Sequence, residues 1–239
     1  YTALIGKGKF LEALDLIRDR MPFAGICGRI CHHPCEQNCN RAKVDEPVSV
    51  RNLKRFVADY ERDLLRQGKS VERENGVEQL EKPQRKEKIA VIGGGPAGLT
   101  CAHDLVKQGF NVTVFEAGKE LGGMMRTGIP EYRLPKDYLD YEIDLLLQEG
   151  IEVRTEMALG RDFTVDELKK QGYSSIFLAI GAQKAKKIPL DGSETDGVIY
   201  GIPFLRDISE GKKPEIGEDV VVIGGGNVAM DVARSALRL

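Results

Sequence analysis

The sequence has no tryptophan, only three histidines and no apolar run long enough to cross a bilayer. A membrane-spanning helix needs about 18 or more such residues, so a membrane span is excluded. The net charge of −2 gives no electrostatic reason to expect nucleic acid or an anionic membrane surface as a partner. What is present is globular: 239 residues, 41% of them hydrophobic, enough for one large domain or two smaller ones.

Cysteine is scarce as well, with five in the chain, and four of these fall in CGRICHHPCEQNC at residues 27–39. A secreted disulfide scaffold is usually shorter and richer in cysteine, so we expect a reducing compartment, the cytoplasm. No signal peptide is evident. The chain starts at Tyr1 and stops inside an expected helix at 235–239, so we expect a fragment of a longer protein.

Closely spaced thiolates bind zinc or iron–sulfur clusters. The four candidate ligands are Cys27, Cys31, Cys35 and Cys39. Their C-x₃-C spacing is neither the usual zinc-ribbon pair nor the ferredoxin run, so the residues alone leave the metal open. Pro34 predicts broken turns here rather than one long helix.

Strand and helix patterns alternate from residue 88 onward, which predicts an α/β fold with a parallel sheet. Before that point, amphipathic helices are expected at 9–20 and after Ser49, followed by a charged linker at 67–87. A capping box at 164–167 predicts a short helix, and another helix is expected from Pro135 to Gly150. The expected strands are 88–92, 111–116, 151–154, 175–180 and 219–223.

A glycine-rich turn, GGGPAG at residues 93–98, follows the first expected strand and opens a helix. In this GxGxxG spacing, the first glycine makes the tight turn and the second lets the backbone approach a pyrophosphate. The third allows close packing, and the helix N-terminus faces the phosphate charge. Glu116 ends the next strand, where a carboxylate can accept a hydrogen bond from a ribose hydroxyl. This order favours a dinucleotide site over a purely structural turn.

A second turn, GGGNVA at residues 224–229, repeats the pattern as GxGxxA. It predicts a second dinucleotide site, with a ligand-free tight turn as the alternative. Two such sites suggest a nicotinamide hydride donor facing a flavin acceptor. Because the cofactors would carry this chemistry, no side chain is singled out as a catalytic acid or base.

These motifs resemble those of the small subunit of NADPH-dependent glutamate synthase and its relatives, which include the N-terminal part of dihydropyrimidine dehydrogenase. The most specific stretches are ELGGMM and GIPEYRLP at 120–135, with VVVIGGGNVAMDVARSALRL at 220–239. The resemblance covers nearly the whole chain. It implies a helical iron–sulfur-type domain at 1–66, the first part of an FAD-binding Rossmann-like domain at 88–200, and the start of an inserted NAD(P)-binding Rossmann domain at 201–239.

The resemblance also implies site residues by matching position. FAD would contact Gly93, Gly95, Pro96, Ala97, Gly98, Glu116, Ala117, Gly122, Gly123, Met124, Arg133, Leu159 and Gly181, and NADPH would contact Gly224, Gly226, Asn227, Val228 and Ala229. On residue type alone, Met124 and Leu159 read as core and Arg133 as a solvated charge. Cys31, Cys35 and Cys39 would be ligands split between two 4Fe–4S clusters whose other ligands precede Tyr1. The position of Cys27 is often not a ligand.

The function implied is an NADPH-oxidising flavoprotein that receives a hydride on FAD. Single electrons would then pass through 4Fe–4S clusters to a larger catalytic subunit or domain, or to ferredoxin. Two alternatives stay open at this point. One is a subunit of an electron-bifurcating NADH-dependent ferredoxin:NADP oxidoreductase, and the other is a non-catalytic iron–sulfur docking module.

Overall fold

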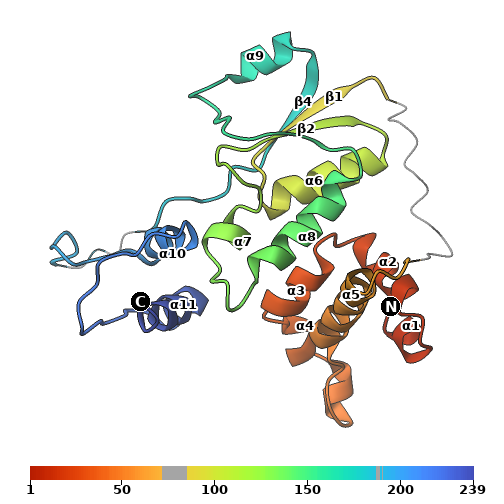
Figure 1. The fold of residues 1–239 in the computed structure, drawn as a ribbon, viewed down its shortest axis with the longest axis horizontal. Coiled ribbons are helices and arrows are strands. Elements are labelled where there is room, and N and C mark those ends of the chain that lie inside the picture. The colour runs from red at the N-terminus through yellow and green to blue at the C-terminus, as the bar shows by residue number, and fades with distance from the viewer. Residues whose placement is uncertain (72–84, 187–188, 190) are drawn as a thin grey trace.

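The computed structural model describes residues 1–71, 85–186, 189 and 191–239 (Figure 1). The strands are β1 Lys88–Ile92, β2 Asn111–Phe115, β3 Glu152–Arg154 and β4 Tyr173–Leu178. The helices are α1 Thr2–Gly6, α2 Phe10–Arg18, α3 Ala24–Ile30, α4 Pro34–Gln37, the 3₁₀ helix η1 Asn40–Lys43, α5 Val50–Arg66, α6 Pro96–Lys107, α7 Met124–Thr127, α8 Lys136–Leu147, α9 Val165–Lys170, α10 Gly201–Ser209 and α11 Asn227–Ala236.

The strands form one parallel sheet in the order β3-β2-β1-β4. In its register, Ile89 of β1 lies opposite Val112 of β2 and Ser175 of β4. The first four expected strands are therefore confirmed: the first matches at both ends, and the ends of the other three differ by up to two residues. The parallel α/β class is confirmed with them.

Apolar side chains leave the central strands toward both faces of the sheet. Val91 and Val114 pack with Leu99 of α6 and Leu139 of α8, and Figure 1 shows both helices on one side of the sheet. Ala90, Ile92 and Phe115 enter a second cluster on the opposite face, with Phe163 and Leu168. Burial on both faces explains why KIAVI and NVTVF read as nearly continuous apolar runs.

The expected strand at 219–223 is wrong for this structure. These residues are irregular, and Val221 and Ile223 are 87% and 70% exposed. A strand is held by its ladder of hydrogen bonds to a neighbour, and none of the strands in the described ranges pairs with this segment. The helix expected after it is present as α11.

The N-terminal helical unit (residues 1–66) has its own core. Leu14 and Ile17 of α2 pack against Val57 of α5, as the helical spacing predicts. Helices α3 and α5 approach so closely at Gly28 that a Cβ there would lie 2.7 Å from the Cα of Arg55. The cysteine stretch is broken into α3, α4 and η1, which confirms the broken turns expected from Pro34. The pattern did not predict α1.

The helical unit also joins the main core. Phe23 and Ile26 belong to the same buried cluster as Val91 and Tyr138. Beside them, the amides of Gly25 and Ile26 donate hydrogen bonds of 2.7 and 2.9 Å to the Glu142 carboxylate of α8. Figure 1 shows α3 and α5 beside α8.

The capping box is confirmed: the amide of Glu167 donates to the Thr164 hydroxyl at 3.3 Å, and the amide of Thr164 donates to the Glu167 carboxylate at 2.7 Å. Most of the expected linker, at 72–84, lies outside the described residues. Across the ranges that the structure describes, no helix is both long and apolar enough to cross a membrane.

Candidate functional site

The first glycine turn connects β1 to α6 and needs its glycines. Gly93 has a φ of +111°, and a Cβ there would lie 2.3 Å from the carbonyl oxygen of Ala179. A Cβ on Gly98 would lie 1.9 Å from the carbonyl oxygen of Gly93. The first and third glycines are therefore fixed by packing within the protein.

The second glycine of this turn leaves open space instead. A Cβ on Gly95 would meet only the Cα of Gly123, at 3.8 Å, which is an ordinary contact. Gly95 caps α6 without a side-chain hydrogen bond, and Pro96 opens the helix. Since the amides of a first helical turn have no intrahelical acceptor, those of Ala97 and Gly98 are available to an anion. Ala97 is exposed.

The ELGGMM segment closes over the turn with its backbone. The amide of Gly122 donates to the carbonyl oxygen of Gly94 at 2.8 Å. Gly123 has a φ of +50°, and a Cβ there would lie 2.9 Å from the Cα of Gly95. Met124 then begins α7 and is half-buried. These contacts place two of the predicted FAD residues, Gly122 and Gly123, directly against the first turn.

Glu116 lies beside the same turn and is held by backbone amides. Its Oε2 accepts a 2.7 Å bond from the amide of Gly94, and its Oε1 accepts a 2.7 Å bond from the amide of Gly118. Each carboxylate oxygen retains a lone pair, so the group can still accept from ribose hydroxyls. The neighbouring Ala117 is exposed.

Two further predicted FAD residues lie near this edge of the sheet. The amide of Met157 donates to the carbonyl oxygen of Glu116 at 2.9 Å, which places the segment before Leu159 beside the acid. Leu159 is half-buried against the Phe115 cluster. Gly181 follows β4, is exposed and has a φ of +69°, and it lies two residues after the Ala179 that packs on the turn.

Arg133 makes an ion pair that the sequence did not predict. Its guanidinium donates a 2.5 Å hydrogen bond to the Asp231 carboxylate of α11, which is 4% exposed. The ion pair joins the YRLP loop to the second dinucleotide motif. Asp231 was not predicted, and its only signal in the sequence is its place on a helix face shared with the buried Ser235.

The second glycine turn opens α11 but follows no strand. Gly224 has a φ of +133°, and Gly226 caps the helix. A Cβ on Gly226 would meet nothing within 4 Å, so this position is even more open than Gly95. Asn227 and Val228 are exposed at this end of the helix, with Ala229 behind them. The helix N-terminus and the open glycine are in place, whereas the strand that normally supports such a turn is not formed.

The four cysteines are spread along the broken helices. Cys27 lies in α3, Cys31 follows its last residue, Cys35 lies in α4 and Cys39 precedes η1. Burial raises the pKa of the Cys27 thiol, and backbone amides lower the pKa of the Cys39 thiol. Within the described part of the chain, no three His, Cys, Asp or Glu side chains are placed to hold a metal ion. A 4Fe–4S cluster takes four cysteines, so this arrangement does not fit a complete cluster site.

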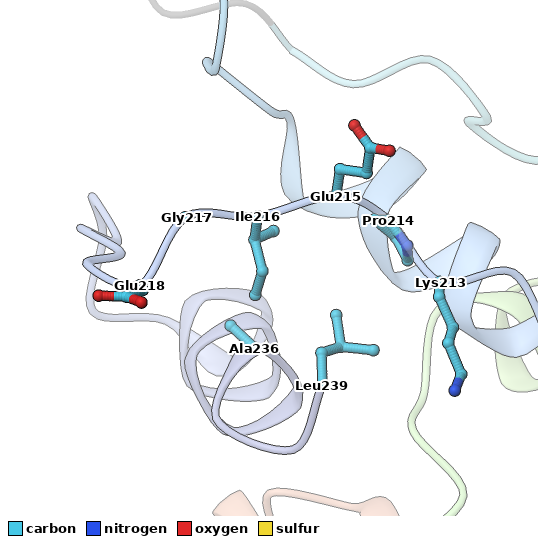
Figure 2. Close-up of a pocket in the computed structure, with 8 residues that line it drawn as sticks. All are labelled: Lys213, Pro214, Glu215, Ile216, Gly217, Glu218, Ala236 and Leu239. Atoms are coloured by element: carbon cyan, nitrogen blue, oxygen red, sulfur yellow. The ribbon is translucent and has the colours of Figure 1, made fainter.

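A cavity of about 680 Å³ lies at the far end of α11 (Figure 2). It is lined by Lys213, Pro214, Glu215, Ile216, Gly217, Glu218, Ala236 and Leu239. Figure 2 shows the Ile216 side chain pointing from the 213–218 segment toward Ala236 and Leu239. It adjoins the C-terminal end of α11, whereas Gly226 caps the opposite end, so it is separate from the second glycine turn.

Glu142 is another buried acid that the sequence analysis missed. It is 1% exposed, and burial raises its pKa to about 7, against the opposing effect of the two amides that donate to it. The available signal was its position three residues after Leu139 and four before Leu146, on the inward face of α8. A carboxylate on an apolar helix face indicates a buried partner.

The chain is similar along its whole length to known oxidoreductases. The chain is 42% identical to the NADP(+)-dependent formate dehydrogenase subunit beta of Moorella thermoacetica, over all of this chain and 36% of that protein. It is 36% identical to the small chain of glutamate synthase (NADPH) of Bacillus subtilis, over all of this chain and 48% of that protein. The chain thus spans less than half the length of these two relatives.

Among solved structures, Mycobacterium tuberculosis FprA in complex with NADPH matches with a TM-score of 0.57 and 25% identity, over 63% of this chain and 36% of that one. Residues 1–65 match the family model for dihydropyrimidine dehydrogenase domain II, 4Fe-4S cluster. Residues 87–239 match the model for pyridine nucleotide-disulphide oxidoreductases. The chain therefore belongs to the pyridine nucleotide-disulphide oxidoreductase family and carries an N-terminal segment of the 4Fe-4S dihydropyrimidine dehydrogenase domain II type.

Proposed function

We propose that this chain is part of an NADPH-oxidising flavoprotein subunit that feeds electrons to a partner. FAD would lie on the first glycine turn and NADPH on the second. The hydride, two electrons and one proton, would pass from NADPH to FAD, and single electrons would leave through 4Fe–4S clusters. The proposed units are the helical domain at 1–66, a linker at 67–87, the first part of the FAD domain at 88–200, and the start of the NAD(P) domain at 201–239.

The observation that carries the proposal is the contrast among the glycines of the first turn. Gly93 and Gly98 are required by the protein's own packing, whereas Gly95 faces open space at the N-terminus of α6. A glycine with nothing against it is what close approach of a pyrophosphate needs. The backbone of Gly123 and the carboxylate of Glu116 border the same turn. These residues fit a dinucleotide.

The chain's own residues would bind and orient the cofactor. The amides of Ala97 and Gly98 would donate to the pyrophosphate, and Glu116 would accept from the adenosine ribose. Ala117, Gly122, Met124, Leu159 and Gly181 would border the rest of the molecule. On the second turn, the residues proposed to border NADPH are Gly224, Gly226, Asn227, Val228 and Ala229.

The iron–sulfur part of the proposal is supported by the match over residues 1–65. The geometry supplies no complete ligand set, so we assign no route for electrons through Cys27, Cys31, Cys35 or Cys39. A larger catalytic subunit or domain, or ferredoxin, is proposed as the acceptor, because the relatives are named as a beta subunit and a small chain. All five cysteines are free thiols, which supports a reducing compartment, the cytoplasm.

The test is anaerobic titration of the intact holoprotein with NADPH. We expect the visible absorption of a bound flavin to be lost with stoichiometric NADPH. A bound flavin that stays oxidised would refute the proposal, and the absence of any flavin would favour a non-catalytic docking module.

A pair of glycine variants locates the flavin. Gly95→Ala places a methyl group in the open space, with its only close neighbour, the Cα of Gly123, at 3.8 Å, so we expect the protein to fold but to lose flavin. Gly217→Ala is the matched control, since its Cβ would also meet only one atom, at 3.8 Å, far along the chain from the first turn. Full flavin content in Gly95→Ala would remove the first turn as the flavin site.

A further inference from the structure

Two residues of the YRLP loop contact α11 and the segment directly after it. We call this the α11 contact and define it as Tyr132, Arg133, Asp231, Arg234 and Arg238. The Tyr132 ring lies within 4.6 Å of the Arg234 guanidinium and 4.3 Å of the Arg238 guanidinium. Its hydroxyl donates a 3.4 Å hydrogen bond to the carbonyl oxygen of Asp231.

The centre of the α11 contact is the ion pair between Arg133 and Asp231. A guanidinium nitrogen and a carboxylate oxygen lie 2.5 Å apart, although the two residues are 98 positions apart in sequence. The Asp231 side chain is 6% exposed and that of Arg133 is 27% exposed. An exposed ion pair contributes little. A buried carboxylate, by contrast, is costly without its partner, so separating α11 from the loop would leave Asp231 either unpaired or newly hydrated.

A second contact joins α10, which precedes the second glycine turn, to α7, which follows Gly123. The hydroxyl of Ser209, the last residue of α10, donates a 2.6 Å hydrogen bond to the carbonyl oxygen of Arg126 in α7. Helix α7 directly follows Gly123, whose backbone touches the first glycine turn. Helix α10 is therefore tied to the helix that follows Gly123, and α11 is tied to the YRLP loop.

We propose that the Arg133–Asp231 ion pair is a positioning device that sets the NADPH-binding helix against the flavin-binding unit. The inference rests on the proposed function. Hydride transfer depends steeply on the separation of the reacting atoms, and a misplacement of about 1 Å can slow a reaction on the order of a hundredfold. Asp231 acts on the reaction through Arg133 and the placement of α11, so it is a positioning residue.

The experiment compares the intact holoprotein with Asp231→Asn, which keeps the shape of the side chain and removes its charge. We expect flavin reduction at saturating NADPH to slow by about tenfold to a hundredfold, with the dissociation constant of NADPH changed less than about threefold. Asp207→Asn is the matched control. It removes an acid from α10 that pairs only with Lys212 of the same unit among the contacts described, and it should behave as wild type.

Amide hydrogen exchange of the flavin-reconstituted protein without NADPH gives a readout independent of turnover. In Asp231→Asn, we expect amide exchange to accelerate about tenfold in residues 129–135 and in residues 227–236. Local opening of these segments costs less free energy in the variant because it no longer has to break the ion pair. The double variant Asp231→Asn/Arg133→Met leaves no charge buried. It should fold, and its amide exchange should be no faster than that of Asp231→Asn alone.

The outcomes separate this inference from the proposed function. Unchanged exchange and unchanged flavin reduction in Asp231→Asn overturn the positioning role while the proposed function stands. A double variant that exchanges markedly faster than Asp231→Asn overturns it too, because Arg133 then holds the loop and α11 independently of Asp231. If NADPH does not reduce the flavin of the wild-type holoprotein, the proposed function and the positioning role are both overturned. Amide exchange still reports on the ion pair in that case.

Discussion

Replacing Glu142 with glutamine has the most distinctive expected effect on stability. Glu142 lies between α8 and α3 and accepts hydrogen bonds from the amides of Gly25 and Ile26 at 2.7 and 2.9 Å. It is 1% exposed, and burial raises its pKa from 4.5 to about 7. Folded protein therefore holds this proton over a range of pH in which unfolded protein has already lost it.

The sign of the pH dependence follows from that difference. The contribution of Glu142 to the free energy of unfolding is fully present below pH 4.5 and is lost as the pH rises to about 7. With about 1.36 kcal/mol for each pKa unit, the loss between about pH 5 and pH 8 is roughly 2.5 kcal/mol. Glutamine does not titrate, so Glu142→Gln lacks this slope.

The assay is urea unfolding of the intact protein, followed by far-ultraviolet circular dichroism at intervals from about pH 5 to pH 8. We expect the stability of Glu142→Gln relative to wild type to rise with pH by roughly 2.5 kcal/mol. Asp144→Asn, on the exposed face of the same helix, is the control and should run parallel to wild type. Parallel curves for Glu142→Gln and wild type would refute the reasoning.

Three further substitutions test separate contacts. Gly98→Ala should destabilise the protein by about 1–3 kcal/mol, because the new Cβ lies 1.9 Å from the carbonyl oxygen of Gly93; an unchanged thermal midpoint would contradict this. Glu61→Ala should cost about 3 kcal/mol in urea unfolding, because it removes the carboxylate that pairs at 2.7 Å with the largely buried guanidinium of Arg18, and a cost typical of a surface residue would count against it. Thr164→Ala should cost about 1 kcal/mol by removing one half of a capping box, detected as faster amide exchange at the start of α9.

The parts of the fold that the sequence predicted correctly are those set by residues close to one another in the chain. The nearly continuous apolar run in KIAVI and the glycine spacing at 93–98 specify a strand and a turn locally, and both are present. The segment 219–223 has an equally apolar pattern, but a strand also requires a partner, and none is described beside it. The local pattern gives a segment its tendency to form a strand, and pairing with a neighbouring strand decides whether the strand forms.

The candidate site divides in the same way. Gly95 and Glu116 were predicted from spacing along one strand–turn–helix–strand unit, and the structure brings them to one turn. The Arg133–Asp231 pair joins residues 98 positions apart, and no spacing rule relates them. Cluster ligands also depend on how separate helices meet, which is why the cysteine spacing did not predict their arrangement.

The core cluster that takes in Phe23 and Ile26 has a consequence for how the molecule can move. The helical unit and the sheet share one apolar interior, so a sliding motion between them would open that interior to water. At the other boundary, α10 and α11 meet the sheet unit through a hydroxyl, an ion pair and a tyrosine ring. Moving this boundary would break the Arg133–Asp231 ion pair, but the shared core cluster includes no residue of α10 or α11, so no common apolar interior would open. We therefore expect any hinge of this chain to lie beside residue 200 and not beside the linker.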